Sequence, residues 1–195
     1  MNRPATPPTG LRERKKAQTR RTIQEQALRL FLSQGYDNTT VDEIARAAGV
    51  SSMTFFRHFP TKESVVESDD YDPLIVALIE QRPPEETPLA ALHHALGEGL
   101  AAVYATDRDA LLVRTRLILR TPALRARLWE NQHATEQMLT KALAARSGQE
   151  PDLPLRVIAA AALAALTATL AIWVEGDGEA HLPELVDEAF TTLDR

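Results

Sequence analysis

The stretch DNTTVDEIARAAGVSSMTFFRHFPTKE, residues 37–63, decides the fold of this chain. It contains two short helical segments separated by Gly49, a residue type that favours a sharp turn. Thr40 and Glu43 have the T-x-x-E spacing of a capping box at the start of the first segment, and Ser51 is the expected N-cap of the second. Two short capped helices around a tight turn are typical of a helix-turn-helix that binds DNA.

Helical spacing continues on both sides of this stretch. Apolar residues recur at helical intervals through residues 11–34, and Gly35 then ends that segment. Thr-Pro pairs at 87–88 and 121–122 begin later helices, because Pro is favoured in the first helical turn. We find no convincing strand alternation. We therefore expect an all-α fold of about nine helices, which span or begin at residues 11–34, 41, 52–58, 62, 88, 107, 122, 155–175 and 183–193.

Charge divides the chain of 195 residues, whose formal net charge is −5. Residues 1–62 contain 11 Lys and Arg against 5 Asp and Glu, a balance of +6, whereas residues 63–195 contain 11 against 22, a balance of −11. Since local positive charge neutralises phosphates, we expect nucleic-acid affinity in the front part. We expect a disordered arm at 1–10, a helix-turn-helix DNA-binding domain at 11–60 and a larger helical domain at 61–195.

The segment 52–58 has the side chains that a recognition helix needs. Small or polar residues at its start suit base edges, and cations at its end suit phosphate. Lys62 lies at an expected helix N-terminus, which attracts anions, so we expect Lys62→Ala to flatten the salt dependence of DNA binding by about one unit. The alternative is that the basic residues only form a solvated surface. The candidate DNA-contacting residues are Thr40, Ser51, Ser52, Met53, Thr54, Phe56, Arg57, His58 and Lys62, with Arg14 and Lys15 of the first helix.

The pattern T-R-R-x-I-x-x-x-A-L-x-L-F-x-x-x-G-Y-x-x-T-T-V-x-x-I-A-x-A-A-G-V-S-x-x-T-F-F-R-H-F-x-T-K-E resembles the N-terminal domain of the tetracycline-repressor (TetR) family over about residues 12–66. The resemblance implies an all-helical homodimeric repressor that binds a palindromic DNA operator. It also implies operator contacts at Thr40, Ser52, Met53, Thr54, Phe56, Arg57, His58 and Lys62. Phe56 stands where the family commonly has Tyr, whose hydroxyl binds phosphate.

An uncharged run, VIAAAALAALTATLAIWV at residues 157–174, dominates the rear part. It is long enough to cross a membrane, but Ala and Thr gain little on entering lipid. The other possibilities are a core helix of a larger domain and a dimer-forming helix. With the last helix, a pair of such helices from each subunit makes the four-helix bundle that the TetR resemblance implies. The candidate dimer residues are Ala162, Ala165, Thr169, Trp173, Leu185, Val186, Ala189 and Phe190.

The middle part, residues 69–148, is where TetR relatives bind an effector. RTRLILRTPALR at 114–125, together with the alanine-rich helix, resembles the mycofactocin-system regulators, which implies an acyl-CoA-like effector. Apolar side chains would hold the acyl chain and Arg would meet phosphate or carboxylate. The alternative is that these residues are ordinary core and surface. The candidate effector-binding residues are Leu92, Leu96, Val103, Arg114, Leu117, Arg120 and Trp129.

The sequence gives little support for metal binding or catalysis. The chain has no cysteine, and its five histidines never fall at i, i+4 on one helix, so we expect no metal site. No nucleophile elbow, phosphate-binding Gly loop or zinc motif is present. We therefore predict a cytoplasmic, nucleoid-associated regulator with no cofactor beyond a small effector. The rival interpretations are a helical enzyme or binding protein for acyl thioesters and a membrane-associated scaffold.

Overall fold

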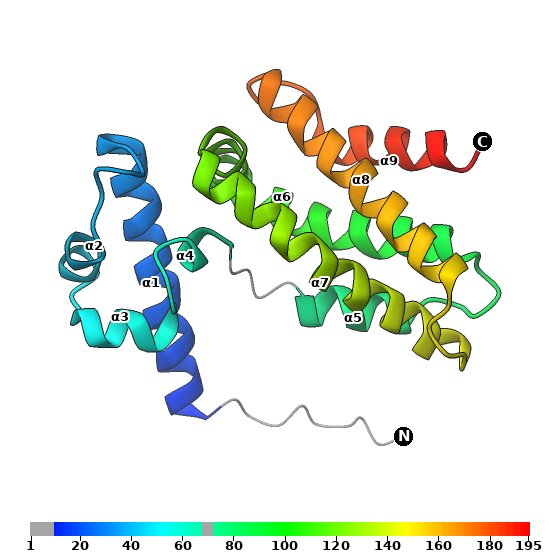
Figure 1. Ribbon diagram of the computed structural model, residues 1–195, viewed down its shortest axis with the longest axis horizontal. Helices are drawn as coiled ribbons and strands as arrows, with labels where there is room; N and C mark the ends of the chain where they lie inside the picture. Colours follow the sequence, from blue (N-terminus) through cyan, green and yellow to red (C-terminus); the bar gives the residue numbers. More distant parts are fainter. Residues whose placement is uncertain (1–9, 68–71) are drawn as a thin grey trace. The chain divides into compact units, whose positions relative to one another are not determined.

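The computed structural model describes residues 10–67 and 72–195, except for the side chains of Glu67, Asp72 and Trp129. Over the described residues the fold is all-α, as the sequence predicts (Figure 1). The expected arm lies outside them apart from Gly10. The described helices are α1 (Leu11–Gln34), α2 (Val41–Ala47), α3 (Ser52–His58), α4 (Ser64–Glu67), α5 (Asp72–Glu80), α6 (Pro88–Arg120), α7 (Pro122–Ser147), α8 (Leu153–Glu175) and α9 (Leu182–Leu193).

The chain divides into two compact units, Met1–Ser68 and Asp69–Arg195. This division falls eight residues beyond the boundary at 60 that the sequence suggests. The reason lies in α4, whose Val65 and Val66 are buried. The side-chain amide of Gln24 in α1 donates a hydrogen bond to the Val65 carbonyl oxygen at 3.3 Å. Helix α4 begins at Ser64, two residues after the predicted start at Lys62, and the Thr61 hydroxyl accepts the Ser64 backbone N–H at 3.2 Å.

Helices α1 to α3 of the first unit form around the local signals in their sequence. Helix α1 ends at Gly35, and the ring of Tyr36 then folds back to 4.9 Å from the ring of Phe31. Gly49 has a φ of 68°, a left-handed value that lets the chain reverse between α2 and α3 within four residues. The buried core of these three helices consists of Ile23, Ala27, Phe31, Ile44, Ala45, Phe55 and Phe59.

The second unit is built around α8, which lies against α6, α7 and α9 (Figure 1). Its inner side contributes fully buried Ala159, Ala162 and Trp173 to a core that α5, α6, α7 and α9 complete. Helix α6 runs through the position where a new helix was expected, but its backbone is non-helical at Asp107, with φ −154° and ψ 52°. Asp107 therefore separates two helices that α6 joins across a kink, and the expected helix start at this residue is confirmed.

The turn between α8 and α9 is fixed to the part of α6 that follows the kink. Arg116 forms an ion pair with Asp177 at 2.8 Å, and Arg108 donates a hydrogen bond to the carbonyl oxygen of Gly178 at 2.5 Å. Asp177 and Gly178 both have positive φ, at 52° and 75°. A Cβ on Gly178 would lie 2.7 Å from a methyl carbon of Leu112, so this position has no room for a side chain. The close packing thus couples α6 to the start of α9.

Candidate nucleic-acid interface

Helix α3 presents one side to solvent and anchors itself with the other. Phe55 and Phe59 are fully buried, with ring centroids 5.8 Å apart, as their spacing predicts. Met53 is 83% exposed, Phe56 is 52% exposed and Arg57 is exposed. The exposed set therefore holds one cation and two apolar groups, which suit a phosphate and the methyl groups or sugars of a duplex groove.

Hydrogen bonds of two serines fix the start of α3. Ser51 accepts the backbone N–H of Thr54 at 3.1 Å and is the N-cap that the sequence predicts. Ser52 donates its hydroxyl proton to Asp42 of α2 at 2.5 Å. Because the hydroxyl proton is donated to Asp42, the Ser52 oxygen can only accept a hydrogen bond from DNA. It therefore suits a hydrogen-bond donor on a base edge. The Ser52–Asp42 bond, which sequence spacing does not reveal, also joins the two helices of the motif.

The capping box at α2 is complete. The Thr40 backbone N–H and hydroxyl both donate to one carboxylate oxygen of Glu43 at 2.8 Å, and the Glu43 backbone N–H donates to the Thr40 hydroxyl oxygen at 3.3 Å. Hydrogen bonds from the Thr40 backbone and side chain hold the pKa of Glu43 below its ordinary value. Thr40 itself is exposed, so the N-terminus of α2 is available to an anion.

The end of α3 is held by a cation from α1. Arg20 donates to the His58 carbonyl oxygen at 2.9 Å, and its guanidinium carbon lies 4.4 Å from the Phe59 ring centroid. Burial lowers the pKa of His58, and the positive charges of Arg57 and Lys16 lower it further. His58 is thus mostly neutral at neutral pH. Arg14 and Lys15, on the first turns of the same helix, are exposed as a phosphate-contacting role requires.

Lys62 occupies a different place from the one that the sequence suggests. Its ammonium donates to the backbone carbonyl oxygens of Tyr36 at 2.9 Å and Thr39 at 3.1 Å. The same ammonium lies 4.1 Å from the centroid of the Tyr36 ring. The charge expected on a DNA phosphate is therefore bonded within the first unit. Sequence reasoning missed these partners because they lie more than twenty positions away along the chain.

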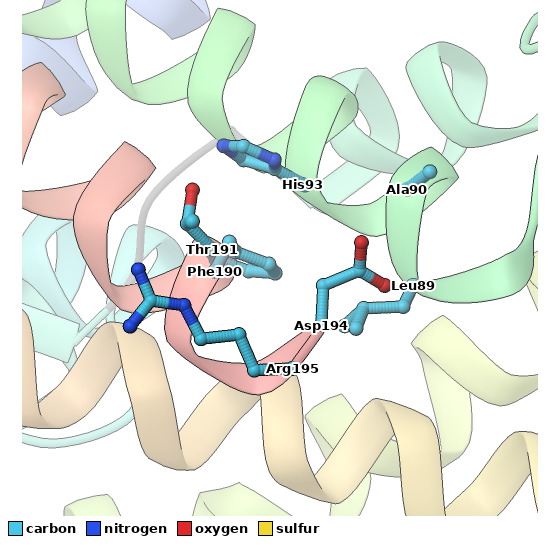
Figure 2. A pocket seen from close by; sticks show the side chains of 7 residues that line it. All are labelled: Leu89, Ala90, His93, Phe190, Thr191, Asp194 and Arg195. Carbon is cyan, nitrogen blue, oxygen red and sulfur yellow. The ribbon is translucent and has the colours of Figure 1, made fainter.

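The candidate effector residues do not form one cluster of exposed groups. Leu92 and Leu96 belong to the buried core of the second unit. Val103, Arg114 and Leu117 are half-buried and Arg120 is exposed, whereas the side chain of Trp129 lies outside the described residues. A hollow of about 230 Å³ lies between α6 and α9, and none of the candidate effector residues lines it. Figure 2 shows the side chains that do. The lining consists of Leu89, Ala90, His93, Phe190, Thr191, Asp194 and Arg195.

Five of the candidate dimer residues are buried within their own chain. They are Ala162, Thr169, Trp173, Val186 and Phe190. The remaining three, Ala165, Leu185 and Ala189, are half-buried. These five side chains fill the core of their own chain, which leaves them little surface for a second subunit. The accessible apolar side of α8 is the opposite one, on which Val157 is 57% and Ile172 is 59% exposed and three alanines lie between them, at Ala160, Ala164 and Ala168.

A helix-turn-helix unit followed by a second helical unit is the architecture of a one-component regulator. Residues 86–195, more than half of the chain, match the family model described as the MftR C-terminal domain. Residues 23–68 match the model described as bacterial regulatory proteins, tetR family. The chain therefore belongs to the TetR family, and its second unit is of the MftR C-terminal type.

Relatives agree with this assignment. The chain is 38% identical over 150 residues to the HTH-type transcriptional regulator TcmR of Streptomyces glaucescens; the match covers 73% of this chain and 66%, just under two thirds, of TcmR. It is 28% identical over 184 residues to the putative mycofactocin biosynthesis transcriptional regulator MftR of Mycobacterium tuberculosis (strain ATCC 25618 / H37Rv). This match covers 92% of this chain and 91% of that relative. Thermus thermophilus FadR, a TetR-family transcriptional repressor solved with lauroyl-CoA, superposes with a TM-score of 0.54 at 25% identity, covering 89% and 92%. This chain is accordingly a DNA-binding transcription regulator, a soluble cytoplasmic protein and not an enzyme.

Proposed function

We propose that this chain binds an inverted-repeat operator on the nucleoid as a homodimer and is released by an acyl-CoA-like effector. The solvent-exposed side of α3 is the observation that supports operator binding. Its buried phenylalanines fix the helix, so exposed Met53, Phe56 and Arg57 are held at defined positions for a groove. Selection from a random duplex pool tests it, with an enriched inverted repeat as the expected result and no enrichment as the refuting one.

The homodimer is supported by the outer side of α8. By length and composition this helix could cross a membrane, yet it packs in the second unit with one third of its most apolar window buried. The outer side is left apolar, and its alanines permit close approach of another helix. A second copy of the same face would cover it with two-fold symmetry.

The dimer proposal is tested by placing a charge on that outer side. Ala164→Glu would bury a carboxylate between two helices, so sedimentation should show a shift toward monomer and operator affinity should fall with it. Ala134→Glu, at an exposed position of α7, is the matched control and should stay dimeric. A dimeric Ala164→Glu variant would place the interface elsewhere.

The effector part is supported by the membership in the MftR C-terminal family and by the lauroyl-CoA complex of the Thermus protein. In the second unit, α6 carries half-buried Val103 before its kink and half-buried Leu117 after it, and both suit an acyl chain. Arg114 is half-buried and Arg120 is exposed on the same helix, and these two are the cations proposed for the phosphate groups.

Thermal unfolding with lauroyl-CoA, coenzyme A and laurate tests the effector class. A ligand present at about 100 times its Kd stabilises the protein by about 2.7 kcal/mol, so lauroyl-CoA should raise the Tm and the two fragments should raise it less. Operator release should follow the same order. Each tenfold loss of operator affinity requires that the ligand bind the released form about 1.4 kcal/mol more tightly than the operator-bound form. Equal responses to all three compounds would refute an acyl-CoA site.

A further inference from the structure

A polar cluster in the first unit joins the start of α4 to the turn before α2. It consists of Tyr36, Thr39, Lys62 and Glu63, and we call it the Tyr36 cluster. The Lys62 ammonium donates to the carbonyl oxygens of Tyr36 and Thr39 and lies over the Tyr36 ring. The Tyr36 hydroxyl donates to Glu63 at 2.6 Å. Tyr36 is 6% and Thr39 is 1% exposed, so both lie in the interior.

We propose that Lys62 is a positioning residue for operator binding, whose ammonium fixes the turn at residues 36–39 and so places the N-terminus of α2. On this view it does not form an ion pair with a DNA phosphate. The inference rests on the proposed operator-binding function and assigns the part that this residue plays in it.

The competing demand on Lys62 decides between the two roles. An ammonium group has three N–H donors, and two of them are bonded to backbone carbonyl oxygens of buried residues. The ring below adds a cation–π contact at 4.1 Å. The third N–H is left for a further partner, but a phosphate that draws the side chain away from the turn would cost both bonds in exchange for one solvent-screened ion pair. The interior position is therefore the more stable one.

The Tyr36 cluster connects directly to the DNA-binding helices. Its Thr39 immediately precedes Thr40, the N-cap of α2, and the Thr39 hydroxyl donates to the Gly35 carbonyl oxygen at 2.8 Å. Helix α2 is in turn bonded to α3 through Asp42 and Ser52. A turn that relaxes would therefore displace the exposed N-terminus of α2 and the recognition helix together. Loss of operator affinity without loss of a phosphate contact is the signature of such a role.

Salt dependence of operator binding by the full chain separates the roles. Lys62→Met retains the side-chain length and removes the charge, and we expect about a tenfold weaker Kd with a salt slope equal to that of the wild type. Arg57→Ala, which removes one exposed cation from α3, is the charge-matched control and should flatten the slope by about one unit. Lys62→Arg should not restore affinity, because the planar guanidinium cannot reproduce two converging bonds from one compact ammonium.

Two outcomes would overturn the proposal. If Lys62→Met flattens the slope by about one unit, Lys62 is a phosphate ligand. If its Kd is unchanged well below the Tm while the Tm falls, Lys62 is structural only. Should Lys62→Met not fold, Lys62→Arg decides: it keeps the charge but not the two converging bonds, and operator affinity equal to that of the wild type would contradict the proposal. The proposed function fails separately, if the wild-type chain enriches no inverted repeat.

Discussion

Trp173 offers a direct test of which side of α8 faces the core. It is the largest fully buried side chain, and its indole N–H donates to the Ala180 carbonyl oxygen at 3.1 Å in the turn before α9. Its ring lies 6.0 Å from that of Tyr104 on α6. We consider Trp173→Phe, which keeps an aromatic ring and removes the N–H donor.

The expected loss has two parts. Breaking the hydrogen bond to Ala180 costs about 1 kcal/mol. The smaller ring leaves roughly 40 Å³ empty and buries less apolar surface, which together cost about 2 kcal/mol. For a unit of this size a loss of about 3 kcal/mol corresponds to a Tm lower by roughly 10 °C.

Unfolding at two protein concentrations that differ about 50-fold, together with sedimentation, measures this effect. Because Trp173 lies in the core of one chain, we expect the same loss of stability at both concentrations and an unchanged dimer dissociation constant. Ile172→Ser is the matched control, since Ile172 is 59% exposed on the outer side and should change dimerisation instead. A Trp173→Phe variant that weakens the dimer and leaves the Tm within about 3 °C would refute the reasoning.

Three further predictions concern local interactions. Thr40→Ala removes the N-cap of α2 and should destabilise the first unit by about 1 kcal/mol in urea unfolding, whereas Thr40→Ser should restore it. Hydrogen bonding to Arg82 lowers the pKa of Glu86 to about 2, so the stability difference between wild type and Glu86→Gln should be full above about pH 4.5 and should vanish as the pH falls toward 2; a constant difference would contradict this. Gly178→Ala adds a Cβ at a φ of 75°, where a methyl group lies 2.7 Å away, and thermal unfolding should show a loss of about 2 kcal/mol.

Local signals in the sequence were sufficient for most helix boundaries. The predicted ranges of α1 and α3 agree with the structure, and α8 and α9 begin within two residues of their predicted positions. Caps and stops act through hydrogen bonds within a few residues, as the Thr40 capping box and the Ser51 N-cap do. The expected helix start at Asp107 is also found, as the non-helical residue at which α6 kinks.

Within the candidate site, the sequence predicts which side chains are buried where helical spacing alone decides it. Phe55 and Phe59 have the i, i+4 spacing of one helix face, and the structure buries both. Lys62 was assigned to phosphate from its place at a helix start, but its partners come from the turn before α2. The candidate dimer residues include buried ones for a related reason. A helix that is apolar all round gives no periodic signal for its inner side, so sequence alone could not separate Trp173 from Ile172.

By itself the sequence determined the helical elements, the helix-turn-helix and the division of charge, because caps, Gly turns and apolar spacing act over one or two helical turns. Only the tertiary structure decided which side of α8 fills the core and where the ammonium of Lys62 is bonded. Both depend on contacts between residues far apart in the chain, whose free energy no local pattern records.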